Sequence, residues 1–269
     1  MKKIFILFLS LSFLWADLEK YNVGTWNLQG SSAASESKWS VSIRQLITGD
    51  NPLDVLMVQE AGVLPNSAMM TGRMVQPGGI PIHEYIWNLG SNSRPNSVYI
   101  YYSRIDVGAN RVNLAIVSRV QADEVFVLPP PTTASRPIIG IRIGNDAFFS
   151  IHALARGGND AGAIITAVDT FFRDRPEINW MIAGDFNRPP DTLLRLVDFD
   201  VANHVNIVSP SSFTQVSGGT LDYAVTGNSN RRQPYIAPLL SAILMLANLR
   251  THLVSDHFPV NFRNFKELR

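Results

Sequence analysis

The sequence predicts an α+β protein whose strands pack as two layers or a sandwich. Short apolar stretches of strand character recur along most of the chain, whereas helical periodicity is clear in only two places. A parallel sheet built from βαβ units needs a helix between successive strands. Because helices interrupt these strands only occasionally, the pattern favours two packed layers over a regular βαβ array.

The predicted strands are rich in Val, Ile, Tyr and Phe, and most are bounded by Gly, Pro, Asn or Ser. Branched and aromatic side chains pack well on a pleated surface, and the bounding residues favour turns. In chain order the stretches are Tyr21–Trp26, Asp54–Gln59, Ser97–Tyr102, Asn113–Val117, Glu124–Leu128, Ile138–Ile143, Ala147–His152, Asn179–Ala183 and Leu221–Val225.

The two predicted helices each show apolar residues at helical spacing between a cap and a stop signal. The first is capped within residues 35–37, ends at Gly49, and carries on one face Trp39, Ile43, Leu46 and Ile47. The second is capped by Asp160, ends before Pro176, and carries on one face Ile164, Val168, Phe171 and Phe172.

One apolar segment, Leu239–Leu249, fits a buried strand and a buried helix equally well, and it is too short to span a membrane. The segment Pro129–Pro131 predicts a stiff turn between two strands. Neither an internal repeat nor a low-complexity linker divides the chain. The residues from 17 to 269 are therefore expected to form one domain.

Composition limits the classes of function. With 46% hydrophobic and 17% charged residues, the chain of 269 residues can bury a sizeable core. Its net charge of +1 provides no general attraction to nucleic acid or membrane, so a polyanion site must be a local basic cluster. The absence of cysteine excludes a cysteine nucleophile and a cysteine-ligated metal.

The first residues, MKKIFILFLSLSFLWA, predict a secretory signal peptide over residues 1–16. Lys2 and Lys3 form its positive start, Ile4–Trp15 its mostly apolar middle, and Ala16 the small residue suited to cleavage. The apolar stretch is too short for a transmembrane anchor. We therefore expect secretion, with the mature chain starting near Asp17.

The segment NWMIAGDFNRPP, residues 179–190, ends an apolar strand on an acid and an amide. Side chains at positions i and i+2 of an extended chain point the same way, so Asp185 and Asn187 would lean together from the strand end. Asp, Asn, Gly and Pro all favour turns, so this segment alone fits an ordinary turn equally well.

Other predicted strands also meet a residue that can bind metal or transfer a proton. These residues are Asn27, Glu60, His152, Asp222, and Asp256 with His257. Such a set of strand ends indicates a site. A G-x-S-x-G elbow, an H-E-x-x-H zinc motif and a phosphate-binding P-loop are all missing from the sequence. Carboxylate and amide oxygens with few imidazoles favour a hard cation, Mg²⁺ or else Mn²⁺ or Ca²⁺.

Four motifs carry a resemblance to the DNase I-like metal-dependent phosphodiesterase superfamily (endonuclease/exonuclease/phosphatase). They are T-W-N at 25–27, Q-E at 59–60, G-D-F-N at 184–187 and S-D-H-F-P at 255–259. Their order and spacing match across nearly the whole mature chain. The longer stretches T-W-N-L-Q-G-S, E-S-K-W, V-N-L-A-I-V-S-R and G-G-T-L-D-Y resemble the narrower family of cytolethal distending toxin B subunits.

The resemblance implies a DNase I-like two-layer β-sandwich flanked by helices, with its site at one edge. It implies a catalytic subunit of a tripartite genotoxin, carried by companion subunits A and C into host cells. There the catalytic chain would nick nuclear DNA as a Mg²⁺-dependent endodeoxyribonuclease, causing DNA damage and cell-cycle arrest. Members of the superfamily also hydrolyse inositol phospholipids, so a phosphoinositide phosphatase using the same site is the alternative.

The resemblance also implies a metal group in which Glu60 binds the ion with help from Asn27 and Asp256. For Glu60 the alternative is an ordinary surface acid at a strand end. A metal ion in such a site polarises the phosphoryl oxygen and offsets charge on the leaving oxygen.

The remaining polar residues are assigned to proton transfer and charge stabilisation. Asp185 orients or deprotonates the attacking water, and Asn187 hydrogen-bonds the charge that develops on phosphorus. His257 contacts the phosphate or acts as the base, with Asp222 fixing its tautomer. His152 is assigned as general acid, with a structural histidine as the alternative. Sequence alone leaves open which histidine is the acid and which is the base.

Arg111 and Arg136 are the expected phosphate contacts, because a guanidinium donates two parallel hydrogen bonds and keeps its charge. Arg136 matches the arginine position of superfamily nucleases, whereas Arg111 lies in a stretch particular to the toxin family. For Arg111 the alternative is an ordinary surface arginine. One departure is notable: Ala61 and Gly62 follow Glu60, where digestive-type DNases carry residues that enter the minor groove. Weak DNA binding and slow nicking are therefore expected.

Overall fold

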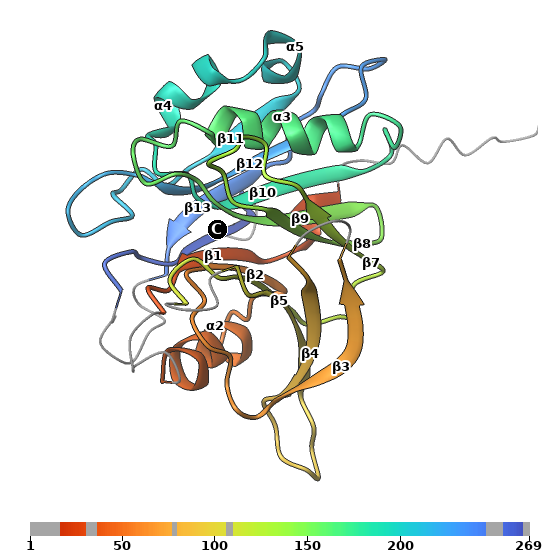
Figure 1. Cartoon of the computed structure of the whole chain (residues 1–269), viewed down its shortest axis with the longest axis vertical. Helices are drawn as coiled ribbons and strands as arrows, with labels where there is room; N and C mark the ends of the chain where they lie inside the picture. Colours follow the sequence, from red (N-terminus) through yellow and green to blue (C-terminus); the bar gives the residue numbers. More distant parts are fainter. Residues whose placement is uncertain (1–16, 31–36, 77–79, 106–109, 246–254, 266–269) are drawn as a thin grey trace, which may run out of the picture.

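The computed structural model describes residues 17–30, 37–76, 80–105, 110–245 and 255–265. They form two β-sheets packed face to face, with helices on both outer faces (Figure 1), so the predicted α+β, DNase I-like sandwich is confirmed. The predicted signal peptide, residues 1–16, lies outside the described residues. Within the described part of the chain, no helix combines the length and apolar character needed to cross a membrane.

The larger sheet has eight strands, in the spatial order β13 (Leu240–Leu244), β14 (Val260–Asn264), β1 (Val23–Asn27), β2 (Val55–Gln59), β6 (Leu114–Ser118), β5 (Ser97–Ser103), β4 (Ile82–Asn88) and β3 (Ala68–Val75). The smaller sheet has six, in the order β11 (Val205–Val208), β12 (Asp222–Asn228), β10 (Asn179–Asp185), β9 (Asp146–His152), β8 (Ile138–Ile143) and β7 (Glu124–Leu128). Among these described strands, the pairs β1–β2 and β9–β10 are parallel and the other neighbours antiparallel.

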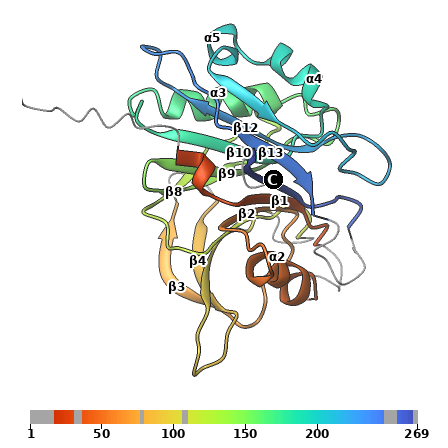
Figure 2. The same cartoon turned by 180° about the vertical axis from the view of Figure 1, so that it is seen from behind.

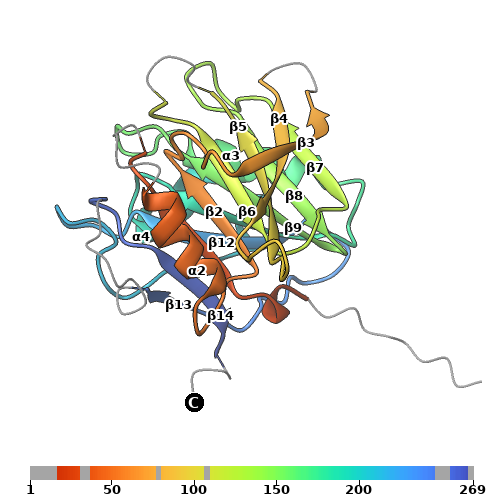
Figure 3. The same ribbon diagram turned by 90° about the horizontal axis from the view of Figure 1, so that it is seen from below.

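Helices cover the outer face of each sheet. The six-stranded sheet is covered by α3 (Ala161–Phe171), α4 (Pro190–Leu193) and α5 (Phe199–Ala202), as the view from behind shows (Figure 2). The short helix η3 (Leu194–Leu196) follows α4, and η1 (Asp17–Lys20) precedes β1. The eight-stranded sheet is covered by η2 (Lys38–Ile43) and α2 (Arg44–Thr48), and α2 lies across β2 and β6 in the view from below (Figure 3).

The buried apolar side chains form three cores between these layers. Because side chains alternate along a strand, one strand contributes to the cores on both of its faces. In β10, Trp180 and Ile182 pack toward α3, whereas Met181 and Ala183 pack between the two sheets. A strand whose two faces are both buried must be apolar on both, as this one is. The third core lies under η2 and α2, where Trp39 is buried against the eight-stranded sheet.

All nine predicted strands are present, with ends that differ by at most a few residues. Residues 240–244 of the ambiguous apolar segment form the edge strand β13, which is half-buried, and residues 246–249 lie outside the described residues. Four of the described strands fall outside the predicted stretches: β3, β4, β11 and β14. In β3 the reason is clear, because an edge strand with exposed residues and a bulge between Met70 and Met74 lacks the alternation that identifies strands.

Both predicted helices are present, and residues 35 and 36 of the first predicted cap lie outside the described residues. Asp160 occupies the N-cap position of α3 without capping it, because its Oδ1 accepts the backbone N–H of Leu154 (2.9 Å). The first helix begins with a π-helical turn, and Ser37 at its N-cap makes no capping hydrogen bond. Gly49 follows its last residue as predicted.

Candidate functional site

The site is built where strand ends from both sheets meet. In the eight-stranded sheet, β1 and β2 run parallel with Asn27 opposite Gln59, so Asn27 and Glu60 lie at the same edge. In the six-stranded sheet, β9 and β10 run parallel with His152 opposite Asp185. The neighbouring strand β12 runs antiparallel and begins at Asp222, so this residue also lies opposite Asp185.

The segment before β14 completes the site and is bound to both sheets. The Ser255 hydroxyl donates to the Asn27 carbonyl (2.7 Å), and the Trp26 indole donates to the His257 carbonyl (3.0 Å). The backbone N–H of Asp256 donates to Gln29 Oε1 (3.0 Å). These contacts hold Asp256 and His257 beside Asn27, although the two segments lie near opposite ends of the chain.

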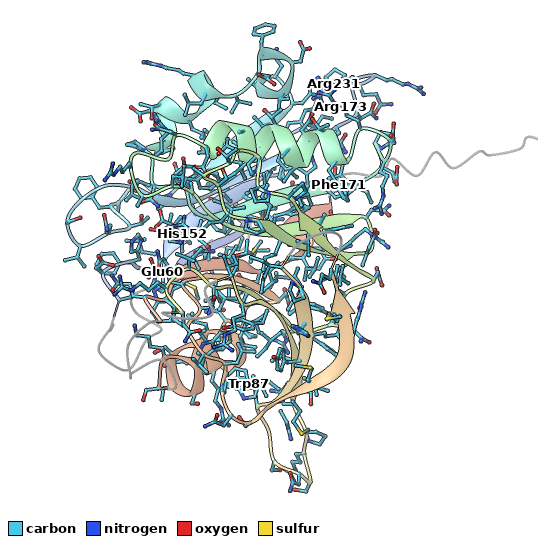
Figure 4. All side chains as sticks on the ribbon, viewed as in Figure 1. Glu60, Trp87, His152, Phe171, Arg173 and Arg231 are labelled. Atoms are coloured by element: carbon cyan, nitrogen blue, oxygen red, sulfur yellow. The ribbon has the colours of Figure 1, made fainter. Side chains whose placement is uncertain are left out.

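The backbone turns sharply at the ends of the site strands. Among the described residues, four non-glycine residues have positive φ, and three of them lie at this site: Gln29 (46°), Glu60 (46°) and Asn187 (49°). Each follows within two residues of the end of β1, β2 or β10. Strained conformations of this kind concentrate at functional sites, where the surrounding structure holds them. Figure 4 labels Glu60 on the eight-stranded sheet and His152 on the six-stranded sheet, at the same side of the sandwich in this view.

Asp185 is the centre of the cluster. Its Oδ2 accepts the side-chain amide of Asn27 (3.1 Å) and lies 3.6 Å from His152 Nε2 and 3.8 Å from His257 Nε2. Its Oδ1 accepts the backbone N–H of Asn187 (2.8 Å). The buried carboxylate therefore faces both imidazoles at once, while two N–H donors fix its orientation.

The surroundings shift the pKa values of Asp185 and His152 in opposite directions. Burial and the nearby Asp222 carboxylate raise the pKa of Asp185 to about 7, against the opposing effects of His257 and the two N–H donors. Burial, together with Arg136 and His257, lowers the pKa of His152 to about 3. At neutral pH, Asp185 is thus poised to accept a proton and His152 is a neutral imidazole.

His257 carries a proton at neutral pH. Burial alone would lower its pKa, but the hydrogen bond from Nδ1 to Asp222 Oδ2 (2.8 Å) and three nearby carboxylates raise it to about 9. Asp222 is itself completely buried. The predicted pairing of His257 with Asp222 is therefore present. In the metal-free site His257 is therefore the protonated imidazole and His152 the neutral one, and the assignment of His152 as general acid stays a prediction.

Two groups of side chains in the site can be compared as metal ligands. One ligand atom each from Asp185, Asp222 and His257 lies within 4.8 Å of the others. However, Asp222 Oδ2 and His257 Nδ1 are already joined by a hydrogen bond (2.8 Å), so this group is better suited to moving a proton. The predicted metal ligands, Glu60, Asn27 and Asp256, fit a hard cation better than this group does. Glu60 bonds to the Asn27 side chain and lies in the field of Asp256, so three oxygen-bearing side chains converge there.

A buried lysine that the sequence analysis did not single out lies behind this set. The Lys38 ammonium donates to the carbonyls of Leu28 and Gln29 (2.7 Å each), and its charge acts on Glu60 and Asp256. Its burial lowers its own pKa, an effect that the two acids oppose. Lys38 is part of the E-S-K-W stretch that carries the resemblance to the toxin B subunits, and that stretch could have drawn attention to it. Only the fold brings its ammonium against the loop after β1.

The two predicted phosphate-binding arginines occupy different positions. Arg136 is half-buried: its Nη1 donates to the carbonyls of His152 (2.7 Å) and Ala153 (2.8 Å), and its charge acts on Glu60 and Asp185. It therefore lies in the site and also holds the end of β9. Arg111 is exposed, in the segment that leads into β6.

The segment carrying Arg111 borders the loop after Glu60. The carbonyl of Asn113 accepts the backbone N–H of Ala61 (2.8 Å), and the Asn113 side chain donates to the Gly62 carbonyl (3.2 Å). The structure thus brings the other predicted site residues into one cluster and leaves Arg111 on its rim.

Comparison with known proteins agrees with this geometry. Residues 24–257 match the endonuclease/exonuclease/phosphatase family, a span that contains every one of these predicted site residues. The chain belongs to this family. Membership of this family supports a hydrolase.

Within the endonuclease/exonuclease/phosphatase family, the chain is similar to cytolethal distending toxin B subunits, as predicted. It is 52% identical to the B subunit of the Escherichia coli toxin over 260 residues, which cover 95% of each sequence. A homolog of the B subunit from Salmonella typhi is also 52% identical, over 94% of this chain and 92% of that protein. A crystal structure of the Haemophilus ducreyi cytolethal distending toxin contains a chain with a TM-score of 0.87 and 51% identity, matched over 92% of this chain and 99% of that one.

Proposed function

We propose that the protein is the catalytic subunit of a secreted genotoxin and hydrolyses DNA phosphodiesters with Mg²⁺ as cofactor. The observation that carries this proposal is the position of Asp185, whose Oδ2 faces His152 and His257 and accepts the Asn27 amide. A carboxylate with a pKa of about 7 beside a protonated imidazole supplies a base and an acid within one cluster.

In this mechanism Asp185 accepts a proton from the attacking water, since its pKa lies close to neutral pH. His257 donates a hydrogen bond to the phosphate and a proton toward the leaving oxygen, and Asp222 holds its imidazole by the 2.8 Å contact. His152 is the neutral neighbour of Asp185. Asn187 gives one amide hydrogen to the Ala153 carbonyl (3.0 Å) and keeps the other to contact the phosphate.

The donor set suits Mg²⁺, which prefers a few carboxylate and amide oxygens and retains water. Glu60, Asn27 and Asp256 would hold it. The ion would supply Lewis-acid polarisation of the phosphoryl oxygen. Arg136, held between the two halves of the site, would contact a phosphate oxygen with the guanidinium nitrogens that it does not use on the backbone.

A phosphoinositide phosphatase is the second candidate, and Arg111 is the observation that favours it. Arg111 is exposed on the rim, where a headgroup with several phosphates could meet a second guanidinium. The loop after Glu60 offers no cation for a duplex, because Ala61 is buried and Gly62 has no side chain. Weak DNA binding and slow nicking remain the expectation.

The toxin context follows from the similarity to cytolethal distending toxin B subunits. We infer that residues 1–16 direct secretion and that companion subunits A and C assemble with the mature chain. The site of action would be the nucleus of the host cell.

One experiment tests the proposed function. Purified mature protein is assayed on supercoiled plasmid and on a phosphoinositide, each with Mg²⁺ and with excess EDTA. Nicking that chelation abolishes and added Mg²⁺ restores is the expected result. Full nicking in EDTA would refute the metal requirement, and phosphate release from the lipid without nicking would establish the second candidate instead.

A further inference from the structure

A polar bridge crosses the apolar interior of the sandwich. The Thr25 hydroxyl donates to Gln59 Oε1 (3.1 Å), and Gln59 Nε2 donates to the Ser150 hydroxyl (3.1 Å). The Ser150 hydroxyl in turn donates to the Val58 carbonyl (3.3 Å). Thr25, Gln59 and Ser150 are each completely buried. Thr25 and Gln59 belong to the eight-stranded sheet and Ser150 to the six-stranded one, so the bridge joins the two sheets.

Each member of the bridge lies directly behind a residue of the site. Gln59 immediately precedes Glu60. Thr25 precedes Asn27 by two positions on β1, and Ser150 precedes His152 by two positions on β9. Residues two apart on a strand share a face, so the bridge is one layer deeper in the sandwich than the site.

The Gln59 amide packs closely against the backbone of Gly184. Gly184 immediately precedes Asp185, and a Cβ at Gly184 would lie 3.2 Å from Gln59 Nε2. The same Cβ would lie only 2.1 Å from the carbonyl oxygen of Ile151, so no side chain fits at this position. The glycine therefore lets β9, β10 and the Gln59 amide approach one another just behind Asp185 and His152.

Apolar contact between the sheets does not by itself set their relative position, because hydrophobic attraction has no direction. A buried amide is different. Leaving it unpaired is costly, and its hydrogen bonds tolerate only a narrow range of distance and angle. Gln59 has a partner on each sheet, so a slide of one sheet against the other would break at least one bond.

We propose that Gln59 is a positioning residue that sets the spacing between the two halves of the site. Asn27 and Glu60 come from one sheet, and His152 and Asp185 from the other, so the reaction depends on that spacing. The inference rests on the proposed phosphodiester hydrolysis for its kinetic readout, but it also has a readout that needs no activity.

The kinetic test uses Gln59→Leu, which removes the bridge, together with a pair at Thr25. Thr25→Val keeps the shape and removes the hydroxyl, whereas Thr25→Ser keeps the hydroxyl. The control is Ser118→Ala, which removes a buried hydroxyl that donates to the Val120 carbonyl (2.7 Å). Ser118 ends β6 and pairs with Val55 at the start of β2, so it lies at the opposite end of β2 from Glu60. All variants are assayed on plasmid, and their thermal stabilities are measured.

A misplacement of about 1 Å at a distance from the chemistry can cost about 10²-fold in rate. We therefore expect Gln59→Leu to lower kcat by about 10- to 100-fold with little change in KM. Thr25→Val should lose more kcat than Thr25→Ser, and Ser118→Ala should keep its kcat despite a comparable loss of stability. A kcat loss that simply follows stability across all four variants would overturn the proposal, as would normal kcat in Gln59→Leu.

The second readout is the NMR spectrum of the imidazole rings of His152 and His257, recorded in EDTA without substrate. Gln59→Leu should move both sets of ring resonances, and Ser118→Ala should leave them in place. Unmoved resonances in Gln59→Leu would also overturn the proposal. A wild-type protein that hydrolyses neither substrate would refute the proposed function, and the NMR comparison would still decide the role of Gln59.

Discussion

The raised pKa of His257 predicts that the stability of the metal-free protein falls as the pH rises from 7.5 to 9. The imidazole has a pKa of about 9 in the folded protein, against 6.5 when free. At about 1.36 kcal/mol per pKa unit, this difference stabilises the folded state by about 3 kcal/mol. Because the folded pKa is the higher one, the stabilisation is fully present below pH 6.5 and is lost as the pH rises through 9.

This pH window separates His257 from His152 and Asp185, the two groups that it faces across the cluster. His152 has a folded pKa of about 3, so its imidazole is neutral throughout the window in the folded protein. Asp185, with a pKa of about 7, is largely ionised above pH 7.5. The slope of the free energy of unfolding against pH should therefore approach, but not exceed, about 1.4 kcal/mol per pH unit.

The assay is urea denaturation in EDTA at several pH values between 6.5 and 9.5. His257→Gln should remove the slope, and Asp222→Asn should reduce it without abolishing it, since Asp185 and Asp256 also raise this pKa. His83→Gln, on β4, is the control and should behave as wild type. A flat wild-type profile, or an equal slope in His257→Gln, would refute the assignment of the proton to His257.

Other substitutions test the remaining assignments. His152→Ala should lower kcat on plasmid by about 10²- to 10⁴-fold, as expected for the general-acid role predicted for His152. His204→Ala, near β11, should keep a near-normal rate, and similar rates in both variants would contradict that role. Arg136→Ala should lower plasmid nicking and phosphoinositide hydrolysis alike, because its guanidinium lies inside the site. Arg111→Ala should lower phosphoinositide hydrolysis proportionally more than nicking, and equal or no losses would count against its role. Lys38→Met should lower the free energy of unfolding in urea by about 1–3 kcal/mol, because two buried carbonyls lose their donor, and an unchanged value would show that the ammonium is dispensable.

Much of the fold was predictable because strand character is a local property. β7 and β8 have the predicted ends, and the other predicted strands differ from the structure by only a few residues. The edge strand β3 escaped prediction because its exposed side chains and its bulge remove the alternation that a half-buried strand shows. Asp160 illustrates a local rule overridden by tertiary contact, since its carboxylate bonds to Leu154 instead of capping α3.

The candidate site was predictable as a set of residue types at strand ends, strengthened by motifs that resemble one family. The roles of its members were less predictable, because they depend on burial and on neighbours distant in sequence. Asp185 and Asn27 are 158 positions apart, yet their hydrogen bond helps to set the orientation of the carboxylate. The opposite protonation states of the two histidines likewise follow from their surroundings: His152 is deeply buried beside Arg136, whereas His257 is hydrogen-bonded to Asp222.

The sequence by itself determined nine of the described strands, that the chain could bury a large core, and which polar residues end those strands. Each of these follows from the side chain and its near neighbours. Only the tertiary structure decided that the strand ends of two sheets meet, that Gln59 bridges them through Ser150, and that Arg111 lies on the rim. These features depend on how the two sheets bury their apolar faces against each other, and that packing joins residues that no local pattern relates.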